Sequence, residues 1–512
     1  MVTAAPADHA EGLTPRFLEA LGIPTERGFD LEPPWEPEPA GLPDPTEHLT
    51  DVGNGRRLAR QYGYWLRYSY QRQQWLYFNR VHWEWDTIGF AERLAKATAR
   101  RIDQEVADCQ DDDRRKDLRS HAGKSESAAK LKAMLICAAS EPYMPVRLEE
   151  LDADPWMLNC LNGCLDLRTG ELRRHRADDL ITKLAPVHYD PDARLDLLDT
   201  FLRDATGGDD ELQAFLQRAA GYSLTGDTSE EKLFFVHGPG AAGKSTFVEA
   251  LRSAIGTYAR MADFETFLAR SMVGGPRNDV AQLAGARFVA SIEVDEGKRL
   301  AEGLMKQITG GDTVAARFLY HESFEFRPAF KLWLCANHAP KVRDDDSAMW
   351  RRILRIPFEH VVPKDDRDPR VKAMLRDPLI GGPAVLAWAV RGAMQWQDRG
   401  LDPPAAVLEA TEAYRLSQDP LADFLAECCE LEPHNWVASS LLRETYEAWA
   451  KENGREKRDV VGGKEWPERL RAAGCEPQLR RVWFEQEGKE KPTRGWAGIT
   501  TSRRGEDPNG SL

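Results

Sequence analysis

Several common features are scarce or missing in this 512-residue sequence. No apolar run approaches the ~18 residues that a membrane-spanning helix needs. The first residues, MVTAAPADHAEG, contain neither a basic region nor an apolar stretch of the kind that marks a secretory leader. The eight cysteines are scattered, and no second pair accompanies Cys160 and Cys164, so we expect no zinc site. The sequence predicts a cytoplasmic protein with free thiols and no membrane partner.

Positive charge is also in short supply. The net charge is -14, which argues against a protein whose whole surface is covered by nucleic acid. It does not exclude one that carries basic residues only along an internal channel. Residues 1–50 hold ten acidic residues against two basic ones, together with many prolines. Prolines remove backbone donors and restrict their neighbours, so this stretch is predicted to be a flexible acidic arm.

The stretch LFFVHGPGAAGKST, residues 233–246, has the pattern of a phosphate-binding loop. A short apolar strand precedes it, and a helix with one apolar face follows. Glycines allow backbone N–H groups to turn toward an anion, and the helix N-terminus adds further donors. Lys244 is expected to contact the β- and γ-phosphates of ATP, and Ser245 to ligate Mg²⁺. The predicted cofactor-binding residues are Gly238, Pro239, Gly240, Ala241, Ala242, Gly243, Lys244, Ser245 and Thr246.

A second apolar strand, residues 287–292, ends in the acidic run Glu293-Val294-Asp295-Glu296. Carboxylates at the end of such a strand can contact Mg²⁺ and polarise the attacking water. We expect Glu293 to do both, and keep Asp295 and Glu296 as alternatives. A helix is predicted over residues 299–308, followed by two alternating runs around His321 that are typical of a hairpin.

Three further residues complete the candidate catalytic set. Asn337 follows the buried strand FKLWLCA, where an uncharged amide can orient the attacking water. Arg351 and Arg352 precede another strand. Arginines this far beyond the phosphate loop are better placed to enter a neighbouring subunit's site than their own, where an arginine finger stabilises charge on the phosphoryl group. The sequence leaves open which of the two is the finger.

The flanking regions are less specific. Residues 65–85 alternate aromatic and polar residues, which predicts a small antiparallel sheet; its aromatics either form a core or stack on bases. Residues 90–140 are predicted helical around a charged loop at 111–127, and 151–175 strand-like. Helices are expected over 195–226 and 370–430, and two helices and a hairpin over 441–499. Residues 480–504 hold seven basic and three acidic residues, which suits either phosphate contact or a solvated surface.

Five motifs, GPGAAGKST, ASIEVDEG, KQITGGD, FKLWLCANHAP and MWRRILRIPF, stand in an order that resembles the superfamily 3 helicase module. The resemblance is to the helicase half of the phage and plasmid primase–helicases, a family that includes the poxvirus primase–helicase. It covers residues 50–365 and extends less clearly to 500. Only about 50 residues precede the predicted collar, so we expect no primase domain.

The resemblance implies an α/β P-loop NTPase core of the AAA+-like superfamily 3 type, an α+β N-terminal collar domain and a C-terminal winged-helix-like domain. The expected boundaries are 1–50 for the arm, 51–200 for the collar, 201–365 for the ATPase, 366–435 for a helical connector and 436–512 for the winged helix. The resemblance also implies that Arg317 and His321 grip DNA within the channel.

The function expected is therefore that of an ATP-dependent DNA helicase or translocase of a phage or other mobile element. It is expected to act in replication as a homo-oligomeric ring, a hexamer, on single-stranded or forked DNA. A separate primase or polymerase is an expected partner, and the location is the bacterial host cytoplasm if the protein is phage-encoded. One alternative is an ATP-gated DNA-binding initiator or regulator without processive unwinding. Another is a small-molecule kinase that uses the same loop.

Overall fold

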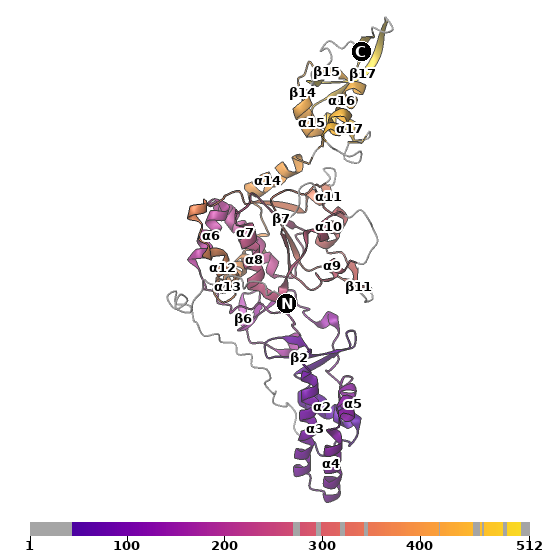
Figure 1. The fold of residues 1–512 in the computed structure, drawn as a ribbon, viewed down its shortest axis with the longest axis vertical. Coiled ribbons are helices and arrows are strands. Elements are labelled where there is room, and N and C mark those ends of the chain that lie inside the picture. Colours follow the sequence, from indigo (N-terminus) through magenta and orange to yellow (C-terminus); the bar gives the residue numbers. More distant parts are fainter. Residues whose placement is uncertain are drawn as a thin grey trace, which may run out of the picture.

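A computed structural model describes residues 44–269, 277–292, 298–317, 323–342, 347–418, 420–453, 461–462, 465–484 and 489–502. The molecule is elongated (Figure 1). A bundle of helices forms one end, a parallel sheet covered by helices forms the middle, and a small mixed unit forms the other end. Most of the predicted acidic arm lies outside the described residues.

The end bundle is built from four helices: α2 (Asp51–Tyr62), α3 (Phe90–Asp108), α4 (Asp112–Ser125) and α5 (Ala128–Ala138). Its core contains Leu58, Leu94 and Met134, each at most 2% exposed. A fully buried ion pair, Arg57 with Glu105, joins α2 to α3. The bundle therefore combines an apolar core with one buried charged contact.

The prediction of a charged loop over residues 111–127 was wrong, because α4 occupies most of it. Asp111 caps the helix by accepting a hydrogen bond from the N–H of Arg114 at 2.8 Å. Leu118 is fully buried and Ala122 nearly so, and these two apolar contacts at i, i+4 hold the helix on α3. The many charges that suggested a loop belong to its solvent-facing side.

Two small antiparallel sheets connect the bundle to the middle of the molecule. They consist of β1 (Leu66–Ser69), β2 (Gln74–Phe78) and β3 (Trp83–Trp85), and of β4 (Met157–Cys160), β5 (Gly163–Asp166) and β6 (Glu171–Arg173). Trp83 is 1% exposed and donates its indole N–H to the carbonyl of Ala177. This Trp is therefore part of a core, which favours the core interpretation of the aromatic run at that position.

The middle of the molecule is a five-stranded, fully parallel sheet in the order β13-β7-β12-β9-β8. Its strands are β7 (Leu233–His237), β8 (Ala259–Met261), β9 (Phe288–Ile292), β12 (Lys331–Ala336) and β13 (Ile353–Pro357). Helices cover both faces, so β7, β9 and β12 are apolar on both sides, as parallel strands require. The predictions of strands at 233–236, 287–292 and 330–336, and of a strand directly after Arg351 and Arg352, are confirmed within a few residues.

One face of this sheet packs against α6 (Asp196–Thr206), α7 (Asp210–Leu224), α8 (Lys244–Ile255) and α13 (Gly382–Arg399). Phe234, Phe247 and Trp333 lie at the centre of that layer. The other face packs against α9 (Asn278–Ala281), α10 (Glu302–Thr309), α11 (Ser347–Trp350) and α14 (Ala405–Leu416). Helix α12 (Arg370–Arg376) contacts α8. Helices α12 to α14 thus pack on the sheet region itself.

Two buried cations lie where the antiparallel sheets meet the parallel one. Arg287 donates to the carbonyls of Leu224 and Asp154, at 3.1 and 3.0 Å, and its guanidinium lies 4.6 Å from the ring centroid of Tyr258. Lys331, 1% exposed, lies beside it at the start of β12. Burial lowers the pKa of both groups. Carbonyl and ring contacts replace the water that these charges lose.

A hairpin and a terminal unit complete the fold. The hairpin pairs β10 (Val314–Arg317) with β11 (Ser323–Phe326), as predicted. The terminal unit contains α15 (Pro420–Cys428), β14 (Cys429–Glu430), β15 (Trp436–Ala438), α16 (Ser439–Glu452), α17 (Trp466–Ala472), β16 (Glu476–Phe484), β17 (Lys489–Ala497) and β18 (Thr500–Thr501). The 3₁₀ turns are Leu148–Glu150, Ala177–Asp179, Gly256–Tyr258, Phe264–Phe267 and Lys364–Asp366. Among the described helices, none is long and apolar enough to cross a membrane.

Candidate nucleotide site

The phosphate-binding loop lies where the motif predicts, between β7 and α8. Gly238 has φ 156°, and a Cβ there would meet the carbonyl oxygen of Phe358 at 1.8 Å, so a side chain does not fit. Gly243 has φ 89° and precedes α8 without a side-chain cap. Its conformation leaves the first N–H groups of α8 available to an anion. This is the backbone geometry that a bound phosphate requires.

Lys244 and Asn337 meet at this loop. The Lys244 ammonium donates to the carbonyls of Gly238 and Pro239, each at 2.7 Å, and to the side-chain oxygen of Asn337 at 2.8 Å. Lys244 is only 7% exposed, and burial lowers its pKa. The contact follows from topology, because β12 lies beside β7 with Ala336 opposite His237. The ammonium thus already donates to three oxygen acceptors at this loop. Phosphate oxygens could replace some of them as its acceptors.

The predicted metal ligands are only partly described. Ser245 is half-buried at the first turn of α8. β9 ends at Ile292, opposite Cys335 of β12, which places the chain just before Glu293 at the same edge of the sheet as Asn337. Glu293 itself, with Asp295 and Glu296, lies outside the described residues. The choice among these three carboxylates therefore stays a prediction.

His237, the last residue of β7, is a part of this edge that sequence reasoning missed. Its Nδ1 accepts a hydrogen bond from the Arg355 guanidinium of β13 at 2.8 Å. Burial lowers the pKa of His237 to about 4, and the nearby charges of Arg355, Lys244 and His338 act in the same direction. The imidazole is therefore neutral near pH 7. The sequence did contain a signal for this role: His237 is a polar residue at the end of an apolar strand, directly before the phosphate loop.

The two predicted finger arginines lie at the opposite edge of the sheet. They precede β13, whose first residue, Ile353, is opposite Leu233, the first residue of β7. The phosphate loop leaves the other end of the same five-residue strand, roughly 16 Å away at ~3.3 Å per residue. The structure therefore does not bring Arg351 or Arg352 to the phosphate loop of its own chain.

The two arginines differ in their exposure to solvent and in their contacts. Arg352 is 7% exposed and donates to the carbonyl of Ala348 at 2.7 Å and to the Glu231 carboxylate at 2.8 Å. The Arg351 side chain is 66% exposed, and its guanidinium is 3.8 Å from the same carboxylate. Arg352 is held within the fold, whereas Arg351 faces solvent. The sequence could not distinguish two adjacent arginines in this way.

Of the predicted DNA contacts, Arg317 is the last described residue of β10 and is exposed. It pairs with Ser323 across the hairpin, and its side chain shares a face with Ala315 rather than with the buried Val314 and Ala316. His321 lies outside the described residues. Arg317 therefore stands on the exposed face of the hairpin, at the end of β10.

A parallel sheet whose strand β7 leads through a glycine-rich loop into α8 is the arrangement of a P-loop nucleotide-binding core. Comparison with known families narrows this class. Residues 55–207 match the family described as D5 N terminal like, and residues 236–352 match a family of unknown function, DUF5906. The two matches are thus to a D5-like family and to DUF5906, and they agree with the primase–helicase resemblance that the order of the motifs indicates.

Curated relatives are viral proteins named as putative helicases. One from Acanthamoeba polyphaga mimivirus is 28% identical over 307 residues, covering 56% of this chain and 32% of that protein. Another, from Frog virus 3 (isolate Goorha), is 25% identical over 437 residues, covering 69% of this chain and 44% of the other. The chain thus spans less than half the length of these relatives.

Among solved structures, the apo form of the NrS-1 C terminal region (305-718) aligns with 85% of this chain and 96% of its own. The TM-score is 0.45 and the sequence identity 11%.

Proposed function

We propose that the chain is an ATP-dependent DNA helicase or translocase of a phage or other mobile element, acting in DNA replication as a ring, expected to be a hexamer. One observation carries the proposal: Lys244 and Asn337 meet at one edge of the sheet, whereas Arg351 is exposed at the opposite edge. A site whose lysine and amide are in place, while Arg351 of the same chain lies at the opposite edge, would be completed by Arg351 of a neighbouring copy. The match of residues 55–207 to the D5-like family and the helicase names of the viral relatives support the same conclusion.

The residues present fit ATP and Mg²⁺. The uncapped start of α8 and the acceptor-bound ammonium of Lys244 form a cationic, donor-rich loop. Lys244 would hold the β- and γ-phosphates, and Ser245 with Glu293 would hold Mg²⁺, which neutralises phosphate charge when bound. Asn337 would orient the attacking water and Glu293 would accept its proton. Arg351 of the next subunit would stabilise the charge on the transferring group.

The remaining parts are assigned by proposal as well. Residues 51–200 would form a collar domain, 201–365 the AAA+-like ATPase, 366–435 a helical connector and 436–512 a winged-helix-like domain, after an acidic arm at 1–50. Arg317 and His321 of the β10–β11 hairpin would contact DNA phosphates in the channel. DNA, single-stranded or forked, is the proposed substrate, with a separate primase or polymerase as partner, in the cytoplasm of the host.

A subunit-mixing experiment tests the shared site. Arg351→Ala and Lys244→Ala proteins should each lack DNA-stimulated ATP hydrolysis. Mixing them in equal amounts should restore about a quarter of the interfaces, because random assembly pairs an intact loop with an intact finger at that frequency. A mixture of Lys244→Ala with the double variant Lys244→Ala/Arg351→Ala is the matched control and should stay inactive. Full hydrolysis by Arg351→Ala alone would refute the shared site.

Strand displacement on forked DNA distinguishes the helicase from its main alternative. An ATP-gated initiator or regulator would bind DNA and hydrolyse ATP but would release no strand. A small-molecule kinase would act as a monomer, and DNA would not change its turnover. The exposed position of Arg351 favours the oligomeric alternatives over the kinase.

A further inference from the structure

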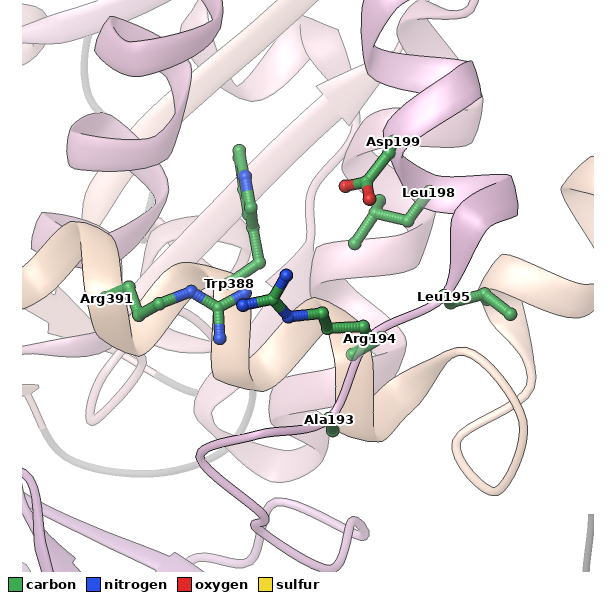
Figure 2. Close-up of a pocket in the computed structure, with 8 residues that line it drawn as sticks. Ala193, Arg194, Leu195, Leu198, Asp199, Trp388 and Arg391 are labelled. Atoms are coloured by element: carbon green, nitrogen blue, oxygen red, sulfur yellow. The ribbon is translucent and has the colours of Figure 1, made fainter.

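A pocket of about 230 Å³ lies between the start of α6 and the middle of α13, apart from the phosphate loop (Figure 2). Arg194, Leu195, Leu198 and Asp199 line it from the α6 side, and Trp388 and Arg391 from α13. Other residues of α6 lie beside the phosphate loop. A Cβ on Gly243 would lie 3.0 Å from the ring of Phe201 and 3.6 Å from Ala205.

Leu195 and Asp199 stand on a different side of α6 from Phe201 and Ala205, because each residue turns the helix by ~100°. One helix therefore separates the pocket from the phosphate loop. The two are distinct sites that share a structural element.

Two guanidinium groups converge in this pocket. In Figure 2, Arg194 and Arg391 extend toward one another from opposite sides. Arg391 donates to the carbonyl of Pro191 at 3.0 Å. Within the described part of the chain, no carboxylate forms an ion pair with either guanidinium. Two guanidinium groups that face one pocket offer charge-assisted hydrogen-bond donors to an anion placed between them.

Trp388 adds a third donor. It is only 8% exposed, and its ring is fixed against Phe247 of α8 in an edge-to-face contact at 6.2 Å. Its indole N–H has no hydrogen-bond acceptor among the residues that the structure describes. The N–H itself is not enclosed by the protein, so a ligand in the pocket can reach it, and indole N–H groups of largely buried rings usually bond an acceptor. An oxygen of a bound ligand would supply it.

Asp199 places a negatively charged hydrogen-bond acceptor on one side of the pocket. Its carboxylate points toward the space that Trp388 and the two guanidiniums border (Figure 2). A carboxylate repels a bare anion but accepts hydrogen bonds from hydroxyl groups. The pocket thus offers three donors to an anion and one acceptor to a donor on the same ligand.

We propose that this pocket binds the sugar-phosphate part of a free nucleotide. The phosphate would lie against Arg194, Arg391 and the indole N–H of Trp388, and a sugar hydroxyl would donate to Asp199. Free nucleotides fit better than DNA, because the hydroxyls of a DNA chain are esterified except at its ends. A nearly buried indole is also more accessible to a small ligand than to a polymer backbone. Because α6 contacts the phosphate loop, binding at either site would alter affinity at the other by the same factor.

The test uses the full chain carrying Lys244→Ala, which disables the phosphate loop without adding a nucleotide that could itself fill the pocket, titrated with ribose 5-phosphate in a calorimeter. One saturable event per chain is expected. The exposed pair Arg194→Ala/Arg391→Ala should weaken it at least tenfold, and Trp388→Phe about threefold or more. Asp199→Asn should weaken ribose 5-phosphate but not inorganic phosphate. Arg399→Ala, on the same helix outside the pocket, is the matched control and should bind as the unaltered protein does.

Two results would overturn the proposal. One is the absence of a saturable ribose 5-phosphate event in the Lys244→Ala protein, or an event that the double arginine variant leaves intact. The other is binding of a short single-stranded oligonucleotide that the double arginine variant abolishes, when ribose 5-phosphate itself does not bind, which would assign the pocket to a DNA backbone. Because both arginines are exposed, their variants should fold, and thermal unfolding checks this independently of binding. Failure here leaves the subunit-mixing test unaffected.

Discussion

The ammonium of Lys244 lies 2.8 Å from the side-chain oxygen of Asn337, although 93 residues separate them. Parallel pairing of β7 with β12 produces this contact, since Ala336 is opposite His237 and each strand delivers its next residues to one edge. The amide holds the lysine by an oxygen acceptor without neutralising its charge. The amide therefore fixes the position of Lys244 without adding a negative charge that would compete with a phosphate.

Replacing Asn337 with alanine should separate catalysis from binding. Lys244 keeps its two carbonyl acceptors, so ATP affinity should change less than about threefold, whereas hydrolysis should fall by roughly 10²-fold through loss of a positioned polar group. Lys244→Ala should abolish both. Lys232→Ala, which removes a lysine bound to the carbonyl of Arg351 at the other edge, is the matched control for binding. Unchanged turnover in Asn337→Ala would exclude the proposed role of the amide.

The neighbouring arginines should differ in what their loss does to stability. Arg352→Ala removes a buried guanidinium and leaves the Glu231 carboxylate without its 2.8 Å partner, which should cost roughly 1–3 kcal/mol of unfolding free energy. Arg351→Ala removes a largely exposed group and should cost less than about 0.5 kcal/mol. Denaturant midpoints measure both. Equal destabilisation by the two variants would contradict the assignment of Arg352 to the stability of the fold and of Arg351 to a neighbouring subunit's site.

Part of this site could be predicted from the sequence, for a physical reason. Glycines, Lys244 and the strand before them are contiguous, so a local pattern specifies the loop, and the strand before Asn337 is apolar from Leu332 to Ala336. Parallel strands then bring both to one edge without further information. The other apolar strands that end at this edge were predictable for the same reason.

The remainder depended on tertiary contacts that no local pattern encodes. The difference between Arg351 and Arg352 arises from Glu231, 121 residues from Arg352. The pairing of His237 with Arg355 requires β13 to lie beside β7. A loop was predicted in place of helix α4 because the segment is rich in charged residues. Its packing depends on only two apolar residues, Leu118 and Ala122.

The neutral His237 predicts a pH dependence of stability. Its pKa is about 4 in the folded chain against 6.5 for an unperturbed histidine. As pH falls below 6.5 the unfolded chain takes up the proton first, so the free energy of unfolding decreases between pH 6.5 and 4. Allowing for the partial exposure of the ring, the loss should be about 1–2 kcal/mol.

His237→Asn keeps an acceptor for Arg355 without a titrating group, so its stability should fall less over the same pH interval. Denaturant unfolding of both proteins at pH 7, 6, 5 and 4.5 measures the difference. Parallel curves for the two proteins would show that His237 is not buried and neutral.

The last prediction concerns the buried ion pair of the end bundle. Arg57 and Glu105 are both 0% exposed, with a closest contact of 2.7 Å, and Arg57 also donates to the carbonyl of His48. Glu105→Gln leaves the guanidinium charged and uncompensated, which should cost about 3–5 kcal/mol locally. Hydrogen exchange should then accelerate at the amides of α2 and α3, while those of α8 in the parallel-sheet region stay protected.

A double change to apolar residues of similar volume, Arg57→Met/Glu105→Leu, should recover much of that protection, because it removes both desolvated charges at once. Comparing the double variant with Glu105→Gln separates the effect of an unpaired buried charge from the effect of altered packing. If Glu105→Gln exchanged like the unaltered protein, the guanidinium would have to find water or another carboxylate, and the bundle would be looser than a fully buried pair allows. If the double variant were no better than Glu105→Gln, the pair would act through its specific hydrogen bonds to α3 and His48 rather than through burial of an unpaired charge.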